Sequence, residues 1–106
     1  MSDARKPLVW LHGEIKTPPL SRAARLEAGL LLRRLQRGET LATPHYELRI
    51  VDQGHNWRIL HRVDRDAIVI AEVFDKKARA TSVAVIARCK DRLRRYDKAA
   101  MERTRT

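Results

Sequence analysis

The sequence predicts an α+β domain in which a small antiparallel β-sheet has its helices packed on one face. Two observations support this fold class. Apolar residues between positions 46 and 63 recur with a period of two, and positions 67–74 are almost continuously apolar, as in strands. Segments 22–36 and 82–97 instead repeat apolar residues every three or four positions, as amphipathic helices do. The expected order is strand, helix, three strands and helix.

A strand is predicted over 8–15, where alternate residues are apolar, and the proline pair at 18 and 19 ends it. Ser21 is a favourable N-cap for the helix at 22–36, and Gly38 ends that helix. The helix has two apolar stripes. The stripe expected to face the core comprises Ala24, Ala28, Leu31 and Leu35. The second stripe comprises Ala23, Leu26 and Leu30. We expect it either to bind a partner protein or to pack within the domain.

The strands after position 46 are expected to form an antiparallel meander. Turn-forming residues at 52–56 and 64–66 separate them, and the last strand, 67–74, should be buried on both faces. Thr81 or Ser82 caps the final helix, whose apolar stripe includes Cys89. With both helices on one side, the other face of the sheet would be left uncovered and able to bind a ligand.

We expect the 106 residues to form one domain with an ordered core at about 8–97 and polar ends at 1–7 and 98–106. No apolar run approaches the ~20 residues of a membrane span, and no signal-peptide-like stretch follows the N-terminus. A cytoplasmic location and the absence of a membrane partner are the resulting expectations. The single cysteine and the spacing of the histidines do not suggest a metal site, and no cofactor is expected.

The net charge is +10, and it is concentrated near the C-terminus. Residues 76–106 contain eleven Lys or Arg residues against three Asp or Glu residues. An excess of this size indicates a polyanionic partner, which can be nucleic acid, an anionic membrane or an acidic protein.

Cations also occur within the predicted sheet. Arg49, Arg58 and Arg62 lie in strands, and Lys76 and Lys77 directly follow the buried strand. Taken singly, each is adequately explained as a solvated edge residue. Together they favour a phosphate-bearing ligand, because arginine and lysine on rigid strands can orient phosphate oxygens. Alternation along neighbouring antiparallel strands predicts that Arg49 and Arg58 project from the same face.

Two histidines lie near these cations. His45 precedes the meander, and His61 lies in its middle strand. Nearby positive charge would favour the neutral imidazole, which can act as a base. The alternative is that both are ordinary surface or packed histidines.

A series of short motifs runs through residues 8–97. They are Leu11-His12-Gly13-Glu14-Ile15, Thr17-Pro18-Pro19, Leu35-Gln36-Arg37-Gly38, Pro44-His45, Glu47-Leu48-Arg49-Ile50, Trp57-Arg58-Ile59, Val73-Phe74-Asp75-Lys76-Lys77 and Arg92-Leu93. In order and spacing, this series resembles the phage-derived toxin-like proteins that are grouped with HigB in the RelE superfamily.

The resemblance implies a RelE-like, microbial RNase-like fold and a type II toxin that cleaves mRNA on the ribosome. It implies attack by the ribose 2′-OH without a metal, and neutralisation by a cognate antitoxin, often a helix-turn-helix protein. The catalytic residues expected from it are Arg49, Arg58, Lys76 and Lys77, with His61 or His45 as base. The residues expected to hold RNA around this site are Arg62, Arg79, Arg88, Lys90, Arg94 and Arg95.

One departure from the family pattern leaves alternatives open. Only Tyr46 separates His45 from Glu47, whereas family members have a longer connection at this point. The chain is therefore either an active mRNA interferase or a catalytically inactive protein of the same fold. An inactive protein would bind nucleic acid or only an acidic antitoxin-like partner.

Overall fold

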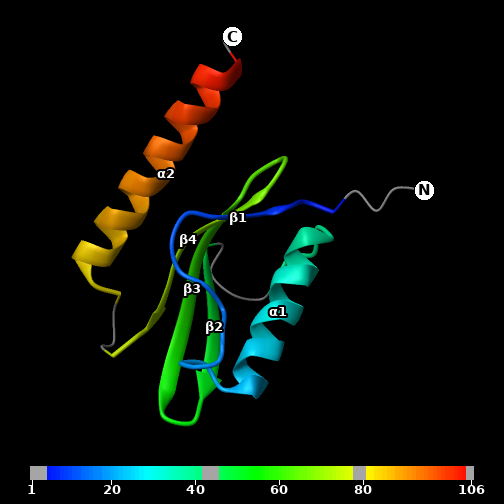
Figure 1. Ribbon diagram of the computed structural model, residues 1–106, viewed down its shortest axis with the longest axis vertical. Helices are drawn as coiled ribbons and strands as arrows, with labels where there is room; N and C mark the ends of the chain where they lie inside the picture. Colours follow the sequence, from blue (N-terminus) through cyan, green and yellow to red (C-terminus); the bar gives the residue numbers. More distant parts are fainter. Residues whose placement is uncertain (1–4, 42–45, 78–80, 105–106) are drawn as a thin grey trace.

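The computed structural model describes residues 5–41, 46–77 and 81–104, and its fold is α+β, as predicted (Figure 1). One four-stranded sheet and two helices make up these residues. In chain order the elements are β1 (Leu8–Trp10), α1 (Arg22–Gln36), β2 (Glu47–Asp52), β3 (His55–Val63), β4 (Ile68–Asp75) and α2 (Val83–Thr104). No helix within the described part of the chain is long and apolar enough to span a bilayer.

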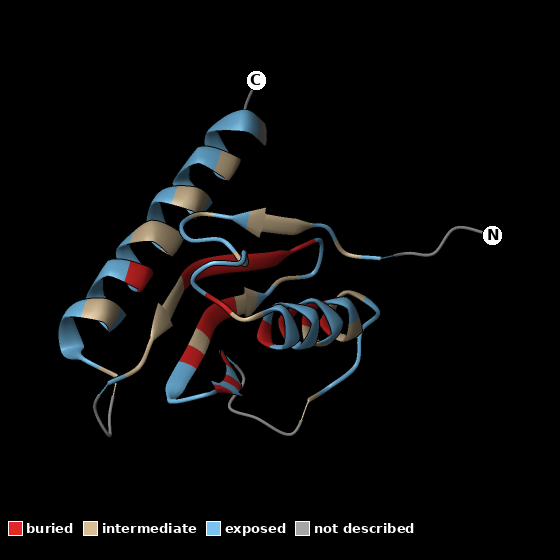
Figure 2. Ribbon diagram, turned by 60° about the horizontal axis from the view of Figure 1, so that its bottom comes forward, coloured by how far each residue is buried: buried red, intermediate tan, exposed pale blue. Residues whose placement is uncertain are grey.

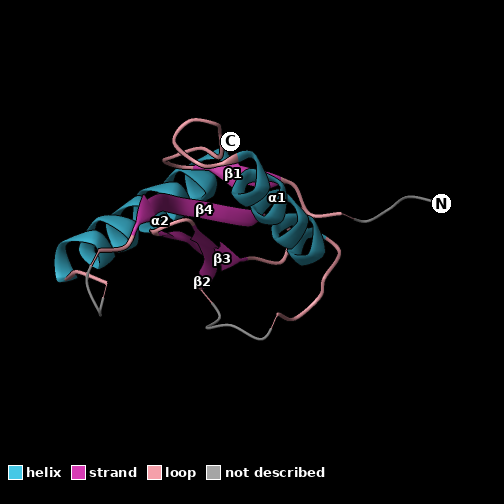
Figure 3. Cartoon of the chain, turned by 90° about the horizontal axis from the view of Figure 1, so that it is seen from below, coloured by secondary structure: helices cyan, strands magenta, loops and turns pink. Residues whose placement is uncertain are grey.

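The sheet is mixed, so the prediction of a wholly antiparallel sheet is wrong. Its strand order is β1-β4-β3-β2, which Figure 3 shows from below. The β2–β3–β4 meander is antiparallel as predicted, but β1 pairs parallel to β4, with Leu8 opposite Ile68. The helical connection is the physical reason. A helix between two strands returns the chain to its starting end, so β1 and β2 run in the same direction.

The two helices lie on opposite sides of the sheet, which corrects the prediction that both pack on one face (Figure 1). Buried α1 residues pack against a cluster that includes Ile59, whereas α2 packs against a cluster that includes the next residue, Leu60. Successive strand residues point to opposite faces. Because β4 is buried on both faces, both sides of the sheet require a cover, and one helix supplies each.

The α1 helix begins and ends as its sequence predicts. The Ser21 side chain accepts a hydrogen bond from the Ala24 amide at 3.0 Å, which caps the first turn. Leu32 is buried in the core, whereas Leu31 is only partly buried. Figure 2 shows the buried face of α1 directed at the sheet. The second apolar stripe is exposed, and Leu26 and Leu30 have exposed fractions of 60% and 54%.

Two element boundaries differ from the predictions. The first strand ends at Trp10 rather than at Ile15, and the chain turns at Gly13, which has a φ of +85°. A Cβ at this position would lie 3.0 Å from the Val73 backbone nitrogen, so the turn requires glycine. The last helix continues to Thr104 instead of fraying after Asp97. Its additional turns are mostly exposed and add little to the core (Figure 2).

Candidate nucleic-acid interface

Arg49 and Arg58 are direct cross-strand partners in the β2–β3 pair. They therefore share a face of the sheet, as predicted. Leu60, two residues along β3 from Arg58, belongs to the cluster beneath α2, so this is the face on which α2 lies. The Arg49 side chain is 50% exposed, whereas that of Arg58 is 12% exposed.

Glu47 partly neutralises this pair of arginines. Its Oε1 lies 2.8 Å from Arg58 Nε, and its Oε2 lies 3.9 Å from the Arg49 guanidinium. Arg58 also donates a hydrogen bond to the Trp57 carbonyl. The 2.8 Å contact is ionic without hydrogen-bond geometry, and neither Arg58 Nε nor Glu47 Oε1 has a hydrogen-bond partner among the described residues. Arg58 is therefore committed to Glu47, while Arg49 presents its charge to solvent.

A second buried carboxylate, Glu72 of β4, faces α2. It accepts a hydrogen bond from Arg92 at 2.5 Å and one from Arg88 at 3.1 Å, and Arg92 also donates to the Ala71 carbonyl. Burial alone would raise the pKa of Glu72, but the hydrogen bonds from the two arginines outweigh it and lower the pKa. Arg88, predicted to hold RNA, thus also anchors α2, although its side chain is 52% exposed.

A groove of about 680 Å³ separates part of α2 from the sheet. Three of the predicted cations, Arg62, Lys76 and Lys90, come together at this groove with Glu47. Burial raises the pKa of the Cys89 thiol in its wall, which keeps the thiol protonated. The apolar part of the lining consists of Leu60, Ala71, Ile86, Cys89 and Leu93.

Arg62 is held within the protein rather than extended toward solvent. Its guanidinium donates paired hydrogen bonds to Asp64, at 2.6 and 2.8 Å, and to Asp97 of α2, at 3.0 and 2.7 Å. These bonds raise the pKa of Arg62 and lower that of Asp97. The contact ties α2 to β3, so a bound phosphate would share this arginine with two carboxylates.

The remaining predicted residues are distributed more widely. Arg94 and Arg95 lie on α2, are 77% and 70% exposed, and contact Asp91 at 3.9 and 3.0 Å. Lys77 lies at the end of β4, where its ammonium group contacts Asp75. His45 and Arg79 fall outside the described residues, and their predicted roles stay predictions.

His61 is buried, with an exposed fraction of 4%. Its Nδ1 lies 3.1 Å from the Ile59 carbonyl oxygen, which can only accept, so Nδ1 carries the proton and Nε2 is the basic nitrogen. Burial lowers the pKa of this histidine. Its register partner Ile70 belongs to the α1-side core, and a register shift in β3 separates it from Leu60. His61 also contributes to the lining of the groove beside α2, so the structure places it near Glu47 and Arg62.

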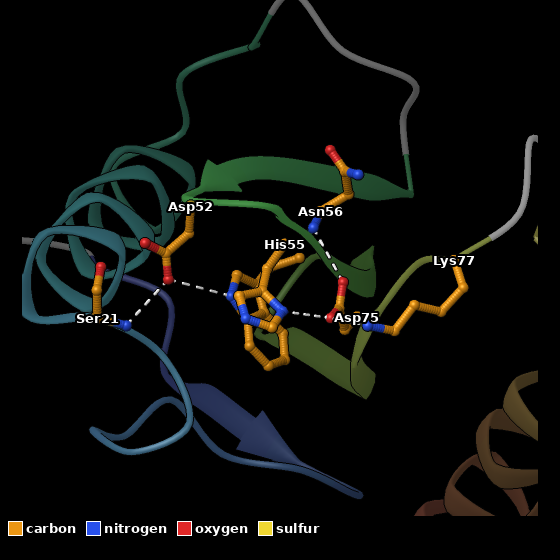
Figure 4. Close-up of polar contacts among 7 residues, drawn as sticks. Ser21, Asp52, His55, Asn56, Asp75 and Lys77 are labelled. Carbon is orange, nitrogen blue, oxygen red and sulfur yellow. Dashed lines mark hydrogen bonds and ion pairs between the residues drawn. The ribbon is translucent and has the colours of Figure 1, made fainter.

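A polar network that sequence reasoning missed lies at the hairpin end of the sheet (Figure 4). His55 Nδ1 is 2.6 Å from Asp75 Oδ2, and the Asn56 amide and the Lys77 ammonium group donate to the same carboxylate at 2.9 and 2.8 Å. Hydrogen bonds from Lys77 and then His55 hold the pKa of Asp75 well below its usual value. The sequence Asp75-Lys76-Lys77 indicated cations at the end of β4, but nothing in it indicated the contact between Asp75 and His55.

The same network extends to α1. His55 stacks on the Trp57 ring with centroids 5.6 Å apart and planes 26° apart. Trp57 Nε1 and the Ser21 amide both donate to Asp52 Oδ2, at 3.3 and 3.0 Å. The hydrogen bonds from Ser21, and to a smaller extent that from Trp57, lower the pKa of Asp52. The network therefore joins the start of α1 to the ends of β2 and β4 (Figure 4).

The shifted groups together predict that acid destabilises the protein. In the folded state, the pKa values of Asp75 and Asp97 lie below the usual 3.8 of aspartate, and that of Glu72 lies below the usual 4.5 of glutamate. The pKa of His61 likewise lies below the usual 6.5 of histidine. Each group binds protons more readily in the unfolded state, so its stabilisation is complete above the unfolded pKa and is lost as the pH falls. We expect the melting temperature to decline below about pH 6.5 and more steeply below about pH 4. Melting curves across this range test it, and a melting temperature that rises toward pH 4 would contradict it.

Comparison with protein-family models, curated proteins and solved structures gave no match. The features of the molecule that bear on its function are the cationic face, the groove and the hairpin network.

Proposed function

We propose that this protein is a toxin of the RelE/HigB type, which binds mRNA on the ribosome and cleaves it without a metal. The observation that carries the proposal is the cross-strand pair of Arg49 and Arg58 on the α2 side of the sheet. Lys76 and Lys90, at the groove formed by α2 and that face, extend the positive surface. RNA is the polyanion that this combination of fixed cations and a net charge of +10 suits best.

The chemistry requires positive charge where phosphate charge grows. In the proposed reaction the ribose 2′-oxygen attacks the adjacent phosphorus and the P–O5′ bond breaks, leaving a cyclic phosphate and a 5′-hydroxyl. Fixed guanidinium groups stabilise the additional charge of the transition state. Arg49, exposed beside Arg58, is the strand residue best placed to contact the phosphate. Arg94 and Arg95 would add a diffuse attraction along α2.

The proposed partner is a cognate antitoxin, often a helix-turn-helix protein, in a cytoplasmic setting. The exposed stripe of Ala23, Leu26 and Leu30 on α1 offers it an apolar contact surface. Exposed apolar residues grouped on one helix edge are typical of a protein-binding surface.

A second candidate is a non-catalytic protein of the same fold that only binds RNA or an acidic partner. The specific observation favouring it is the internal compensation of the cations. Arg58 is paired with Glu47, and Arg88 and Arg92 are paired with Glu72. These arginines contribute less to an incoming phosphate than unpaired ones would.

Arg49→Ala and Arg94→Ala form a matched pair of variants for testing the site. Both arginines are at least half exposed, and each lies 3.9 Å from a carboxylate, that of Glu47 for Arg49 and that of Asp91 for Arg94. We expect Arg49→Ala to slow mRNA cleavage in a translating extract by roughly 10²-fold, the effect of losing one transition-state donor. Arg94→Ala should slow it only slightly, and both variants should melt like the parent, because exposed ion pairs stabilise little.

The outcomes separate the candidates. Equal cleavage by Arg49→Ala and the parent would place the chemistry elsewhere. If the parent binds RNA with a steep salt dependence but leaves the message intact, the non-catalytic candidate is correct.

A further inference from the structure

The groove beside α2 adjoins the arginine pair to which the proposed function assigns the phosphate. We propose that this groove takes one guanine base of the bound RNA, and that the Glu47 carboxylate accepts hydrogen bonds from the base. The inference rests on the RNA-binding part of the proposed function and specifies the nucleotide that the site takes. The groove volume of about 680 Å³ is within the roughly 300–1,000 Å³ of small-molecule sites.

The floor of the groove is a row of side chains that crosses three strands. Glu47 of β2 is paired with Leu60 of β3, and both line the groove together with Ala71 of β4. The neighbouring row on the same face is the pair of Arg49 and Arg58, two residues away along each strand. Two residues of a strand span roughly 7 Å. A phosphate held at Arg49 therefore leaves the base of the same nucleotide within reach of the groove floor.

The rest of the lining combines an apolar wall with positive charge. The wall on the α2 side contains Ile86, Cys89 and Leu93. Lys76 and Lys90 also line the groove, and neither contacts a carboxylate among the described residues. Apolar side chains pack against the face of a base, and cations attract its phosphate. The groove thus meets both requirements of a nucleotide site, whereas an apolar peptide would not need the lysines.

Glu47 is the group in the groove that can distinguish one base from another. Its side chain is 7% exposed, yet no described residue donates a hydrogen bond to its carboxylate. A buried polar group without a hydrogen bond is rare in proteins. The ionic contact with Arg58 occupies Oε1 at 2.8 Å, whereas Oε2 lies 3.9 Å from Arg49 and can still accept a hydrogen bond from a ligand.

The chemistry of a carboxylate favours guanine over the other bases. An ionised carboxylate can only accept hydrogen bonds, so it binds best to an edge with adjacent donors. Guanine presents two neighbouring donors, N1–H and the 2-amino group. Adenine and cytosine each have a ring-nitrogen acceptor beside the amino group, and uracil has a carbonyl on either side of N3–H. These acceptors would repel the carboxylate oxygens.

Amide NMR of the purified parent protein, titrated with three nucleotides, tests the inference. Inosine monophosphate lacks only the 2-amino group of guanosine monophosphate (GMP), and adenosine monophosphate (AMP) has an acceptor at N1. We expect GMP to shift the amides of Leu60, Ala71 and Cys89. It should bind about 10- to 100-fold more tightly than AMP, the discrimination that a good paired hydrogen bond provides. Inosine monophosphate should bind with intermediate affinity.

Glu47→Gln should remove the preference for GMP over AMP, because the amide places a donor where the carboxylate has an acceptor. Glu14→Gln is the matched control and should keep the preference, since Glu14 is 66% exposed, contacts Lys16 and lies outside the groove lining. The NMR spectra also show whether Glu47→Gln folds. If it does not fold, the comparison of the three nucleotides on the parent protein decides.

The possible failures are distinguishable. If GMP and AMP bind equally, or if neither shifts the groove amides, the guanine site is wrong, even where the parent cleaves mRNA. If GMP binds selectively but the parent leaves mRNA intact in a translating extract, the proposed cleavage fails and the guanine site stands. A folded Glu47→Gln variant that still prefers GMP as strongly as the parent would overturn the role of Glu47.

Discussion

Replacing Arg58 with alanine is expected to lower the free energy of unfolding by about 3 kcal/mol, because it leaves a buried carboxylate without its nearest cation. Glu47, its partner at 2.8 Å, has a side chain that is only 7% exposed. This loss of stability is at the lower end of the range for a broken buried ion pair, because the Arg49 guanidinium remains 3.9 Å from Oε2 of Glu47. Urea denaturation of Arg58→Ala and the parent measures this difference.

The double variant Arg58→Met/Glu47→Leu is the informative control. Because Arg58 Nε and Glu47 Oε1 lack hydrogen-bond geometry, the attraction between them compensates poorly for their lost hydration. Removing both charges should therefore recover most of the stability lost in Arg58→Ala. Arg49→Ala, at a half-exposed position, should cost no more than about 1 kcal/mol. An Arg58→Ala variant as stable as the parent would show that Glu47 is not held in place by this pair.

Replacing Glu72 with alanine is expected to loosen α2 from the sheet and to cost roughly 3 kcal/mol. Glu72, 7% exposed, accepts hydrogen bonds from both Arg88 and Arg92. The apolar contacts that also hold α2 come from a small cluster, in which Leu60, Ala71 and Cys89 are buried and Phe74, Val85 and Leu93 are partly buried. Loss of this carboxylate therefore removes the contacts of both Arg88 and Arg92 with β4 through Glu72. It leaves Arg92, whose side chain is 17% exposed, without an ionic partner and bonded only to the Ala71 carbonyl.

Native-state hydrogen exchange distinguishes this result from a general loss of stability. Amides of α2 should exchange by local opening well before those of β3 and β4. Asp91→Ala is the matched control on the same helix, because Asp91 pairs only with the exposed Arg94 and Arg95 among the contacts described here. It should change stability by less than about 0.5 kcal/mol. Uniformly faster exchange in Glu72→Ala would contradict a specific role in attaching α2.

Local patterns predicted the local structure well. The limits of α1, the β2–β3–β4 meander and the shared face of Arg49 and Arg58 follow from periodicity and turn residues, because these depend on neighbours in the chain. The apolar run at 67–74 identified β4 and also implied that both faces of this strand are buried. The prediction that both helices pack on one face did not take this into account. The parallel pairing of β1 depends on contacts between distant segments, for which periodicity contains no signal.

The hairpin network shows the same limit within the candidate site. Asp75 is 20 positions from His55, and each residue looks ordinary in its own segment, one at a turn and the other at a strand end. Their contact follows only once the β3–β4 register places Trp57 opposite Asp75. Likewise, the burial of His61 depends on which face of β3 meets α1. Sequence reasoning identified the chemistry of these residue types but not their distances.

The pairing of β1 with β4 has a consequence for synthesis of the chain. β1 leaves the ribosome first, yet its partner residues follow roughly 60 positions later, since Leu8 pairs with Ile68. The meander and α1 need only nearer segments, and loop closure favours near contacts over distant ones. We therefore expect β1 to pair only after the β2–β3–β4 meander has formed, as the final strand of the sheet. On this expectation, β1 completes the sheet and does not nucleate it.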